Sequence, residues 1–172
     1  MQIKTFTSFR PEHKQLYRQI LALTQPINDT YPEYARWFWN KFISGLKKGE
    51  RMYIIAQEDN TLAGCVLIKK TPEEQKICTF FVEGGFREKG LGKQLMDQTL
   101  KELGLHPLIT VSGRNLPLLS RLLKQSGFHL SACKRGVYNP QDTEYYFNDA
   151  KADAVKNSLI PLLIQRMKQR DM

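Results

Sequence analysis

The sequence predicts an α/β (α+β) fold, in which helices flank a single mixed, mostly antiparallel sheet with a central parallel strand pair. Most of the expected strands follow one another through short turns, which is typical of antiparallel pairing. One strand–helix–strand unit, over residues 77–111, is instead typical of a parallel pair. The chain has 172 residues, of which 41% are hydrophobic and 25% charged, as expected for one domain with a real core.

The N-terminal half is expected to contain a strand, two helices and a hairpin. Apolar residues alternate along the strands and recur at helical spacing along the helices. In order, the expected elements are strand 3–9, a helix opened by Pro11, the aromatic helix 31–46, and hairpin strands 51–57 and 62–69. Gly49 follows the aromatic helix, where glycine favours termination, and Asp59-Asn60 is a hairpin turn signal.

The C-terminal half is expected to contain one parallel unit and a terminal hairpin. Strand 77–82, the amphipathic helix 91–103 and strand 108–111 form a right-handed crossover unit. Pro117 then lies in the first turn of another helix, a position that proline favours. Strands 128–138 and 144–147 complete the predicted sheet.

The most informative stretch, Phe86 to Lys93, reads Phe-Arg-Glu-Lys-Gly-Leu-Gly-Lys and joins a strand to a helix. Two glycines beside a helix start allow a ligand to approach the backbone closely. The first amides of a helix have no internal partners, and the helix dipole adds partial positive charge. Together with Arg87, Lys89 and Lys93, these features predict a pyrophosphate site. Neither the three-glycine dinucleotide fingerprint nor the P-loop pattern occurs here.

The pattern Arg87-x-x-Gly90-x-Gly92 resembles the acyl-CoA signature of the GNAT acyltransferase superfamily, Gln/Arg-x-x-Gly-x-Gly/Ala. The resemblance covers roughly residues 50 to 130 and includes the element order. It implies the GNAT fold, here with an extra C-terminal helix, and acetyl-CoA as the cosubstrate. An ordinary glycine turn that caps a helix in another α/β fold is the alternative.

The resemblance implies that backbone groups hold acetyl-CoA. Phe80, Phe81 and Val82 would pair with the pantetheine arm as an added strand would. The Val82 amide, where the family's strand bulges and splays, would donate to the thioester oxygen. The residues whose amides would wrap the pyrophosphate are Glu88, Lys89, Gly90, Leu91, Gly92 and Lys93. Asn115 resembles the family's pantetheine-binding asparagine, with capping of the following helix as the alternative.

The general acid is left open by the sequence. Many family members carry a tyrosine at the position of Leu123, and leucine cannot donate a proton. Ser120, one turn earlier, is a candidate to protonate the leaving thiolate. Another group or water is the alternative.

The general base is equally open. An acceptor amine with a pKa of ~10.4 must lose a proton before it attacks. Glu83, just after Val82, and Glu33, at the start of the aromatic helix, are the candidates. The alternative for both is a solvated surface carboxylate, and a water chain anchored by Thr110 or Ser112 is a further option.

The acceptor pocket should involve residues 27–42, because this region flanks the acyl end in the family. Tyr31, Tyr34 and Trp39 are the expected substrate contacts. Aromatic residues of this segment could line a pocket or simply pack on the sheet.

The net charge of +9, with a sequence pI near 9.5, could serve the polyanionic coenzyme or steer an acidic protein or RNA. A generally basic surface is the alternative. We therefore carry three functions from the sequence: an N-acetyltransferase acting on a primary amine of a small molecule or protein, a toxin-like enzyme that acetylates aminoacyl-tRNA, and a non-catalytic CoA-binding module.

The sequence lacks the features of secreted, membrane and metal proteins. The N-terminus has no long apolar signal region, and the tract Leu159 to Ile164 is too short to span a bilayer. Cys65, Cys78 and Cys133 are too scattered to indicate a disulfide framework or a zinc site. A cytoplasmic protein without metal is therefore expected.

The chain is expected to divide into a catalytic domain, residues 1–149, and a helical extension of that domain, residues 150–172. The extension carries apolar residues on one face and basic residues on the other. It could pack on its own domain or on a homodimer mate, or it could tether RNA or a protein.

Overall fold

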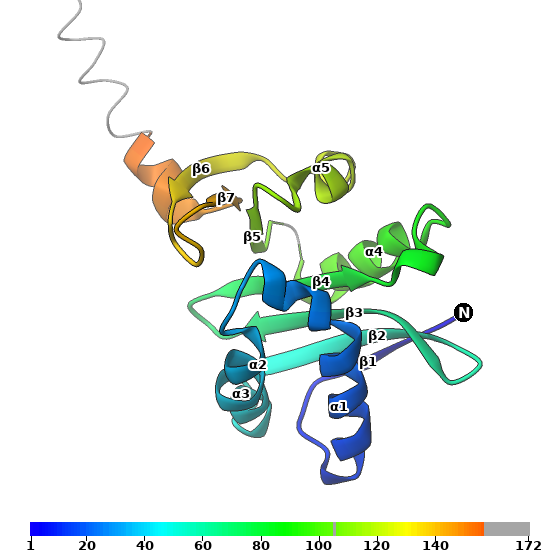
Figure 1. Cartoon of the computed structure of the whole chain (residues 1–172). Coiled ribbons are helices and arrows are strands. Elements are labelled where there is room, and N and C mark those ends of the chain that lie inside the picture. The colour runs from blue at the N-terminus through cyan, green and yellow to red at the C-terminus, as the bar shows by residue number, and fades with distance from the viewer. Residues whose placement is uncertain (105, 157–172) are drawn as a thin grey trace, which may run out of the picture.

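The computed structural model describes residues 1–104 and 106–156 (Figure 1). Its seven-stranded sheet has the order β1-β2-β3-β4-β5-β7-β6. The strands are β1 (Gln2–Phe6), β2 (Arg51–Glu58), β3 (Thr61–Lys70), β4 (Gln75–Val82), β5 (Leu108–Ser112), β6 (Leu130–Arg135) and β7 (Thr143–Phe147). The β4–β5 pair is parallel and the other pairs are antiparallel, which confirms the predicted fold class.

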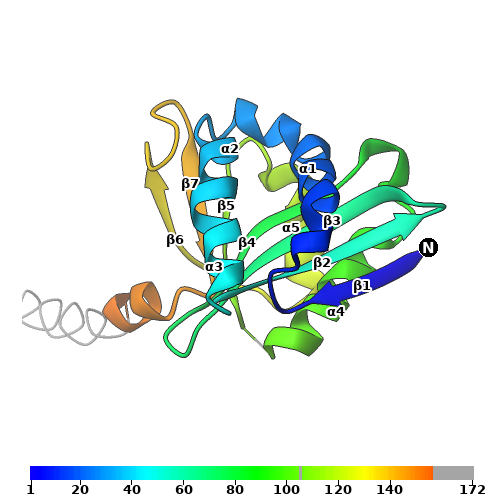
Figure 2. The same ribbon diagram turned by 90° about the horizontal axis from the view of Figure 1, so that it is seen from below.

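Helices cover both faces of the sheet (Figure 2). The longer ones are α1 (Lys14–Leu23), α4 (Leu91–Leu103) and α5 (Leu116–Gln125). The shorter segments are η1 (Pro11–His13), η2 (Gln25–Asp29), α2 (Tyr34–Trp37), η3 (Phe38–Ile43), α3 (Ser44–Lys47) and η4 (Gly84–Phe86). In Figure 2, α1, α2 and α3 lie in front of the sheet, while α4 and α5 lie behind it.

Each face of the sheet has its own core. On one face, Tyr17 and Ile20 of α1 pack with Phe38 and Phe42 of η3 against the buried side of β2 and β3. On the other, Leu95 and Met96 of α4 join Leu123 of α5. The alternation of side chains along each strand produces these two clusters.

The aromatic helix differs from its prediction at its start and in its middle. Helix begins at Tyr34 rather than at Tyr31, and residues 38–43 adopt a π-helical turn. The wider turn still buries Phe38 and Phe42, as the helical spacing predicted. Starting the helix later leaves Tyr31 in the preceding segment, which matters for the site.

Two expected strands are shorter than predicted. β1 ends at Phe6 instead of residue 9, and β6 begins at Leu130 and ends at Arg135 instead of spanning 128–138. The Asp59-Asn60 hairpin is confirmed, since both residues have positive φ, +47° and +65°, as a two-residue hairpin turn requires. Both cysteines in the predicted strands, Cys65 and Cys78, were expected to be buried; Cys65 is buried, whereas Cys78 is only partly so.

The C-terminal extension begins as a helix at residues 150–156. The Asp153 carboxylate there contacts His129 Nε2 at 2.7 Å and accepts a hydrogen bond from Ser131 at 3.1 Å. The rest of the predicted extension, from Asn157 onward, lies outside the described residues. The division into residues 1–149 and 150–172 stays a prediction.

Candidate active site at the opening between β4 and β5

The parallel strands β4 and β5 separate soon after they meet (Figure 1). In the described chain they pair at Lys76–Leu108 and Ile77–Ile109. Beyond Ile77, β4 continues to Val82 along β3, while β5 continues along β7. The edge of β4 that faces β5 is therefore unpaired over its last residues, and an extended ligand could add to it as a strand.

The direction of one amide shows which groups face this opening. Glu83 N–H donates to the Ala63 carbonyl of β3 at 2.9 Å. Because successive backbone groups of a strand point to opposite edges, the N–H groups of Val82 and Phe80 point toward β5. The structure thus places the predicted Val82 amide at the opening, with Phe80 deeper and Phe81 turned toward β3.

The position of the β4 bulge corrects one expectation. The register against β3 shifts between Thr79 and Ile77, so the extra residue is Cys78, four residues before Val82. The strands also splay directly after Ile77. The bulge lies at the apex of the opening rather than at Val82, because the strands must twist apart where pairing ends.

The glycine-rich loop places the start of α4 at the outer end of this opening. Gly90 caps α4 with φ +78°, and Glu88 also has positive φ, +60°. A Cβ at Gly92 would meet Leu122 Cδ2 at 3.7 Å, which is an ordinary contact. Internal packing therefore does not demand glycine at residue 92, whereas close approach of a ligand to the backbone does. The predicted amides of Glu88 to Lys93 surround this helix start.

The basic side chains of the loop are exposed but already have partners. Arg87 Nε donates to the Val82 carbonyl at 3.0 Å, which holds the guanidinium beside the β4 edge. Lys93 pairs with Asp97 at 2.6 Å, and Lys89 lies over the Phe86 ring. Both lysines are on the surface, where such contacts exchange readily for a phosphate.

On α5, the predicted residues are distributed differently. Asn115 occupies the N-cap position, but its side chain makes no capping hydrogen bond, so its amide remains available to a ligand. Leu123 is fully buried in the core and Ser120 is exposed. Leu123 is thus a packing residue, and the structure supplies no contact that activates Ser120.

Each of the two predicted bases already has a partner of its own. Glu83 accepts a hydrogen bond from the Gly85 amide at 2.7 Å and so caps η4. Glu33 pairs with Arg36 at 3.5 Å, and 78% of its side chain is exposed. Both positions suit the surface carboxylates that were the alternative reading.

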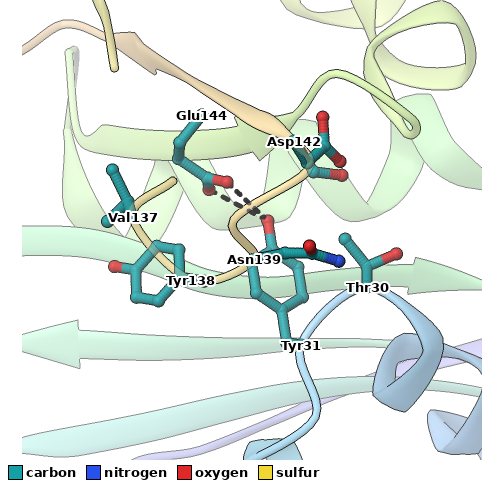
Figure 3. Close-up of a pocket in the computed structure, with 8 residues that line it drawn as sticks. Thr30, Tyr31, Val137, Tyr138, Asn139, Asp142 and Glu144 are labelled. Carbon is teal, nitrogen blue, oxygen red and sulfur yellow. Dashed lines mark hydrogen bonds between the residues drawn. The ribbon is translucent and has the colours of Figure 1, made fainter. Parts of the chain in front are cut away.

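A different carboxylate lies beside the opening. Glu144 of β7 stands opposite Ser112 of β5 and is only 4% exposed. Its two oxygens accept hydrogen bonds from the Tyr31 hydroxyl at 2.9 and 3.1 Å (Figure 3). A charge this buried requires a polar partner, and the Tyr31 hydroxyl provides one.

Tyr31 and Tyr34 connect the two sides of the opening. The Tyr34 hydroxyl lies 3.2 Å from Thr79 Oγ1 on β4, while Tyr31 reaches Glu144 on β7. The segment that joins η2 to α2 therefore crosses the opening on the α1–α2 face. Of the three predicted substrate contacts, Tyr31 lines the pocket described below, whereas Tyr34 is buried against Thr79 and does not line it. Trp39 is 40% exposed, packs edge-on against Phe38, and does not line the pocket.

A narrow pocket surrounds the Tyr31–Glu144 pair, and the side chains that line it leave almost no free volume inside (Figure 3). Its lining is polar and aromatic and comes from the segment before α2, from β5, and from the loop between β6 and β7. The lining residues are Thr30, Tyr31, Ser112, Val137, Tyr138, Asn139, Asp142 and Glu144. Two of them are carboxylates and none is Lys or Arg, in a chain whose net charge is +9.

Burial controls the ionisation of this pocket. Burial raises the pKa of Glu144 above its usual range, although hydrogen bonds from Thr110 and Tyr31 and the charge of Lys76 oppose this. Burial and the Glu144 charge raise the pKa of Tyr31, so its phenol stays protonated and donates. The pair therefore consists of a hydroxyl donor and a carboxylate whose affinity for protons is enhanced.

Sequence reasoning missed Glu144 because nothing local distinguishes it. It lies 113 residues from Tyr31, and only the insertion of β7 beside β5 brings the two together. One signal was present: Glu144 directly precedes Tyr145, Tyr146 and Phe147 in a predicted strand, where an acidic residue is unusual.

Comparison with known proteins agrees with this architecture. The model of the acetyltransferase (GNAT) family matches residues 14–128, which is more than half of the chain. The chain therefore belongs to the GNAT acetyltransferase family, as the glycine motif indicated. No curated protein sequence matches it significantly.

Solved structures share the fold at low identity. A GNAT-family protein from Desulfovibrio desulfuricans has a TM-score of 0.66 and 17% identity, over 85% of this chain and 97% of that one. The ribosomal-protein-S18-alanine N-acetyltransferase from Escherichia coli has a TM-score of 0.64 and 14% identity, over 85% of this chain and 92% of that one. An aminoglycoside 6'-N-acetyltransferase complexed with coenzyme A has a TM-score of 0.63 and 13% identity, over 86% of this chain and 95% of that one. Identities this low show a common fold alone.

Two negative observations concern the described residues, 1–104 and 106–156. They contain no group of three or more His, Cys, Asp or Glu side chains placed to hold a metal ion. None of their helices is long and apolar enough to cross a membrane.

Proposed function

We propose that this protein is an acetyl-CoA-dependent N-acetyltransferase that transfers an acetyl group to a primary amine of a small molecule or protein. The observation that carries the proposal is the opening between β4 and β5. It presents the unpaired edge of β4, and that edge leads through the glycine loop to the helix start of α4. A cosubstrate with an extended arm and a pyrophosphate matches both parts.

Acetyl-CoA would lie along β4 with its parts at different depths of the opening. With the pyrophosphate at residues 88–93, the pantetheine arm runs toward the apex near Cys78, and Val82 meets the arm first. The Phe80 amide lies deeper and is the better-placed donor to the thioester oxygen, while the Val82 amide pairs with the arm. The Arg87 guanidinium, now on the Val82 carbonyl, is within the same region and adds positive charge.

The reaction is a direct displacement. The neutral amine attacks the thioester carbon, and a backbone N–H stabilises the charge that grows on the oxygen. The carbon–sulfur bond breaks, and CoA leaves as the thiolate. Leu123 provides no acid, so the thiolate takes its proton from solvent or from the proton that the amine releases.

Calorimetry with acetyl-CoA, followed by measurement of CoA thiol release, tests the proposal. The acceptors should include tyramine, spermidine, an aminoglycoside, a peptide with an N-terminal alanine, and aminoacyl-tRNA. We expect acetyl-CoA binding and thiol release with at least one amine. Binding without release would favour the non-catalytic module, and absence of binding would refute the assignment. A low rate without acceptor is the necessary baseline, since hydrolysis also releases thiol.

A further inference from the structure

We infer that Glu144 is the acidic subsite for the acceptor, where it holds a cationic primary amine and takes up one of its protons. This inference deepens the proposed function and rests on it. It assigns the missing base to β7, away from the central strands. It also narrows the acceptor to an amine without a neighbouring negative charge.

Glu144 lies beside the opening, close to the segment that reaches β4. Ser112 lies three residues beyond the last β4–β5 pair, and Glu144 stands directly across from Ser112. Tyr31 contacts Glu144, and Tyr34, three residues later, contacts Thr79 next to Phe80. One short segment therefore spans from the carboxylate to the expected thioester position on β4.

The lining of the pocket around Glu144 is acidic. The pocket lining has two carboxylates and no basic side chain, although Lys and Arg outnumber Asp and Glu by 26 to 17 in the chain and the charge of Lys76 on β4 reaches Glu144. Its aromatic rings, Tyr31 and Tyr138, pack against each other edge-to-face with centroids 5.4 Å apart. The two carboxylates are therefore the groups that favour an ammonium ion. A phosphate or carboxylate near the amine would be repelled.

Proton transfer follows from the same contacts. The acceptor binds as an ammonium ion and gives one proton to a Glu144 oxygen, which frees the nitrogen lone pair. The neutral amine then attacks the acyl carbon, the carbon–sulfur bond breaks, and a second N–H proton is released to the leaving thiolate or to solvent. The groups that face Glu144 come from every neighbouring element: Tyr31 before α2, Lys76 of β4, Thr110 and Ser112 of β5, Tyr138 and Asp142 of the β6–β7 loop, and Tyr146 of β7. Tyr31 is a positioning residue, because its O–H orients the carboxylate.

The first experiment compares tyramine with tyrosine, which differ by one carboxylate. With CoA bound, the carboxyl ¹³C resonance of Glu144, identified by its loss in Glu144→Gln, should move saturably on addition of tyramine. Tyrosine should move it little. Tyramine that leaves this resonance in place, with CoA binding intact, would overturn the ammonium site. Absence of CoA binding would instead overturn the proposed function.

The second experiment measures rates with tyramine. Glu144→Gln keeps an oxygen for the Tyr31 hydroxyl but cannot take a proton, so kcat should fall by about 10²-fold or more with CoA affinity unchanged. Glu73→Gln, the same change at an exposed turn, is the control. A rate for Glu144→Gln equal to that of the control would overturn the proton role. If no amine leads to thiol release, both the proton role of Glu144 and the transferase assignment are overturned. The Glu144 carboxyl resonance of the first experiment still tests the ammonium site in that case.

The pH dependence of the transfer rate tests the role of Tyr31. The rate should rise as Glu144 ionises, because the carboxylate is the active form. The Tyr31 hydrogen bond lowers the pKa of Glu144, so Tyr31→Phe should move this acidic limb to higher pH. A purely structural role would lower the rate without moving the limb. An unmoved limb in a folded variant would therefore overturn the positioning role.

Discussion

Replacing Gly92 with Asp should separate CoA binding from folding. A side chain at this position meets only an ordinary contact, Leu122 Cδ2 at 3.7 Å from the new Cβ, so the helix accommodates it. Glycine is also a poor helix residue, and a carboxylate in the first turn interacts favourably with the helix dipole. The free energy of unfolding should therefore stay unchanged or rise by about 0.3–1 kcal/mol.

Binding should respond in the opposite direction. A carboxylate about 6 Å from a phosphate, at an effective dielectric near 20, costs about 3 kcal/mol. This corresponds to roughly a hundredfold loss of acetyl-CoA affinity. Calorimetry measures the affinity, and thermal unfolding measures stability. Gln98→Asp is the control, because it adds the same charge to the same helix farther from the glycine loop, where the Gln98 side chain contacts Thr5 and Glu102. Wild-type affinity in folded Gly92→Asp protein would refute the pyrophosphate assignment.

Three further variants test other parts of the fold and site. Leu123→Ala should cost about 2–5 kcal/mol of stability, because the side chain is fully buried, yet leave the rate of the folded fraction little changed; a hundredfold rate loss with intact stability would show a chemical role. Gly64→Ala should cost about 1–3 kcal/mol, because its Cβ would lie 2.8 Å from the Phe81 carbonyl oxygen; unchanged thermal unfolding would contradict this packing. Burial raises the pKa of Glu144, so the folded protein holds this proton more tightly than the unfolded chain. The stability of the wild type relative to Glu144→Gln should therefore fall as pH rises from the ordinary Glu value through the raised pKa, and a pH-independent difference in urea unfolding would argue against it.

Local patterns predicted the elements that local forces decide. Helix α4 begins and ends where its amphipathic pattern and flanking glycines indicated, at Leu91 and Leu103. The Asp59-Asn60 turn was recognisable because few residue pairs adopt positive φ together. The aromatic helix was less accurate, because a π-helical turn keeps the same residues buried while the hydrogen-bond pattern changes, and burial was the signal used.

Long-range contacts explain what the sequence did not reveal. The bulge at Cys78 depends on how β3, β4 and β5 twist against one another, and the residue type at a bulge carries little information. Glu144 became a candidate only because β7 lies between β5 and β6 in the sheet. The glycine loop, in contrast, is contiguous in sequence. A contiguous candidate phosphate site can therefore be proposed from one sequence, whereas a candidate acceptor site assembled from residues 30 to 144 cannot.

The distribution of charge gives the two substrates separate approaches to the same opening. Arg87, Lys89 and Lys93 surround the outer end of β4 and the start of α4, where a polyanion is favoured. Glu144 and Asp142 lie across β5, in a pocket whose lining contains no basic residue. An anionic cosubstrate and a cationic acceptor would each be repelled from the other's entrance and would meet where β4 and β5 separate. The basic residues around the site are then explained by the anionic cosubstrate, without a nucleic-acid acceptor. This arrangement requires that the affinity for acetyl-CoA fall steeply as salt rises. The rate of transfer to a neutral amine should then change little with salt.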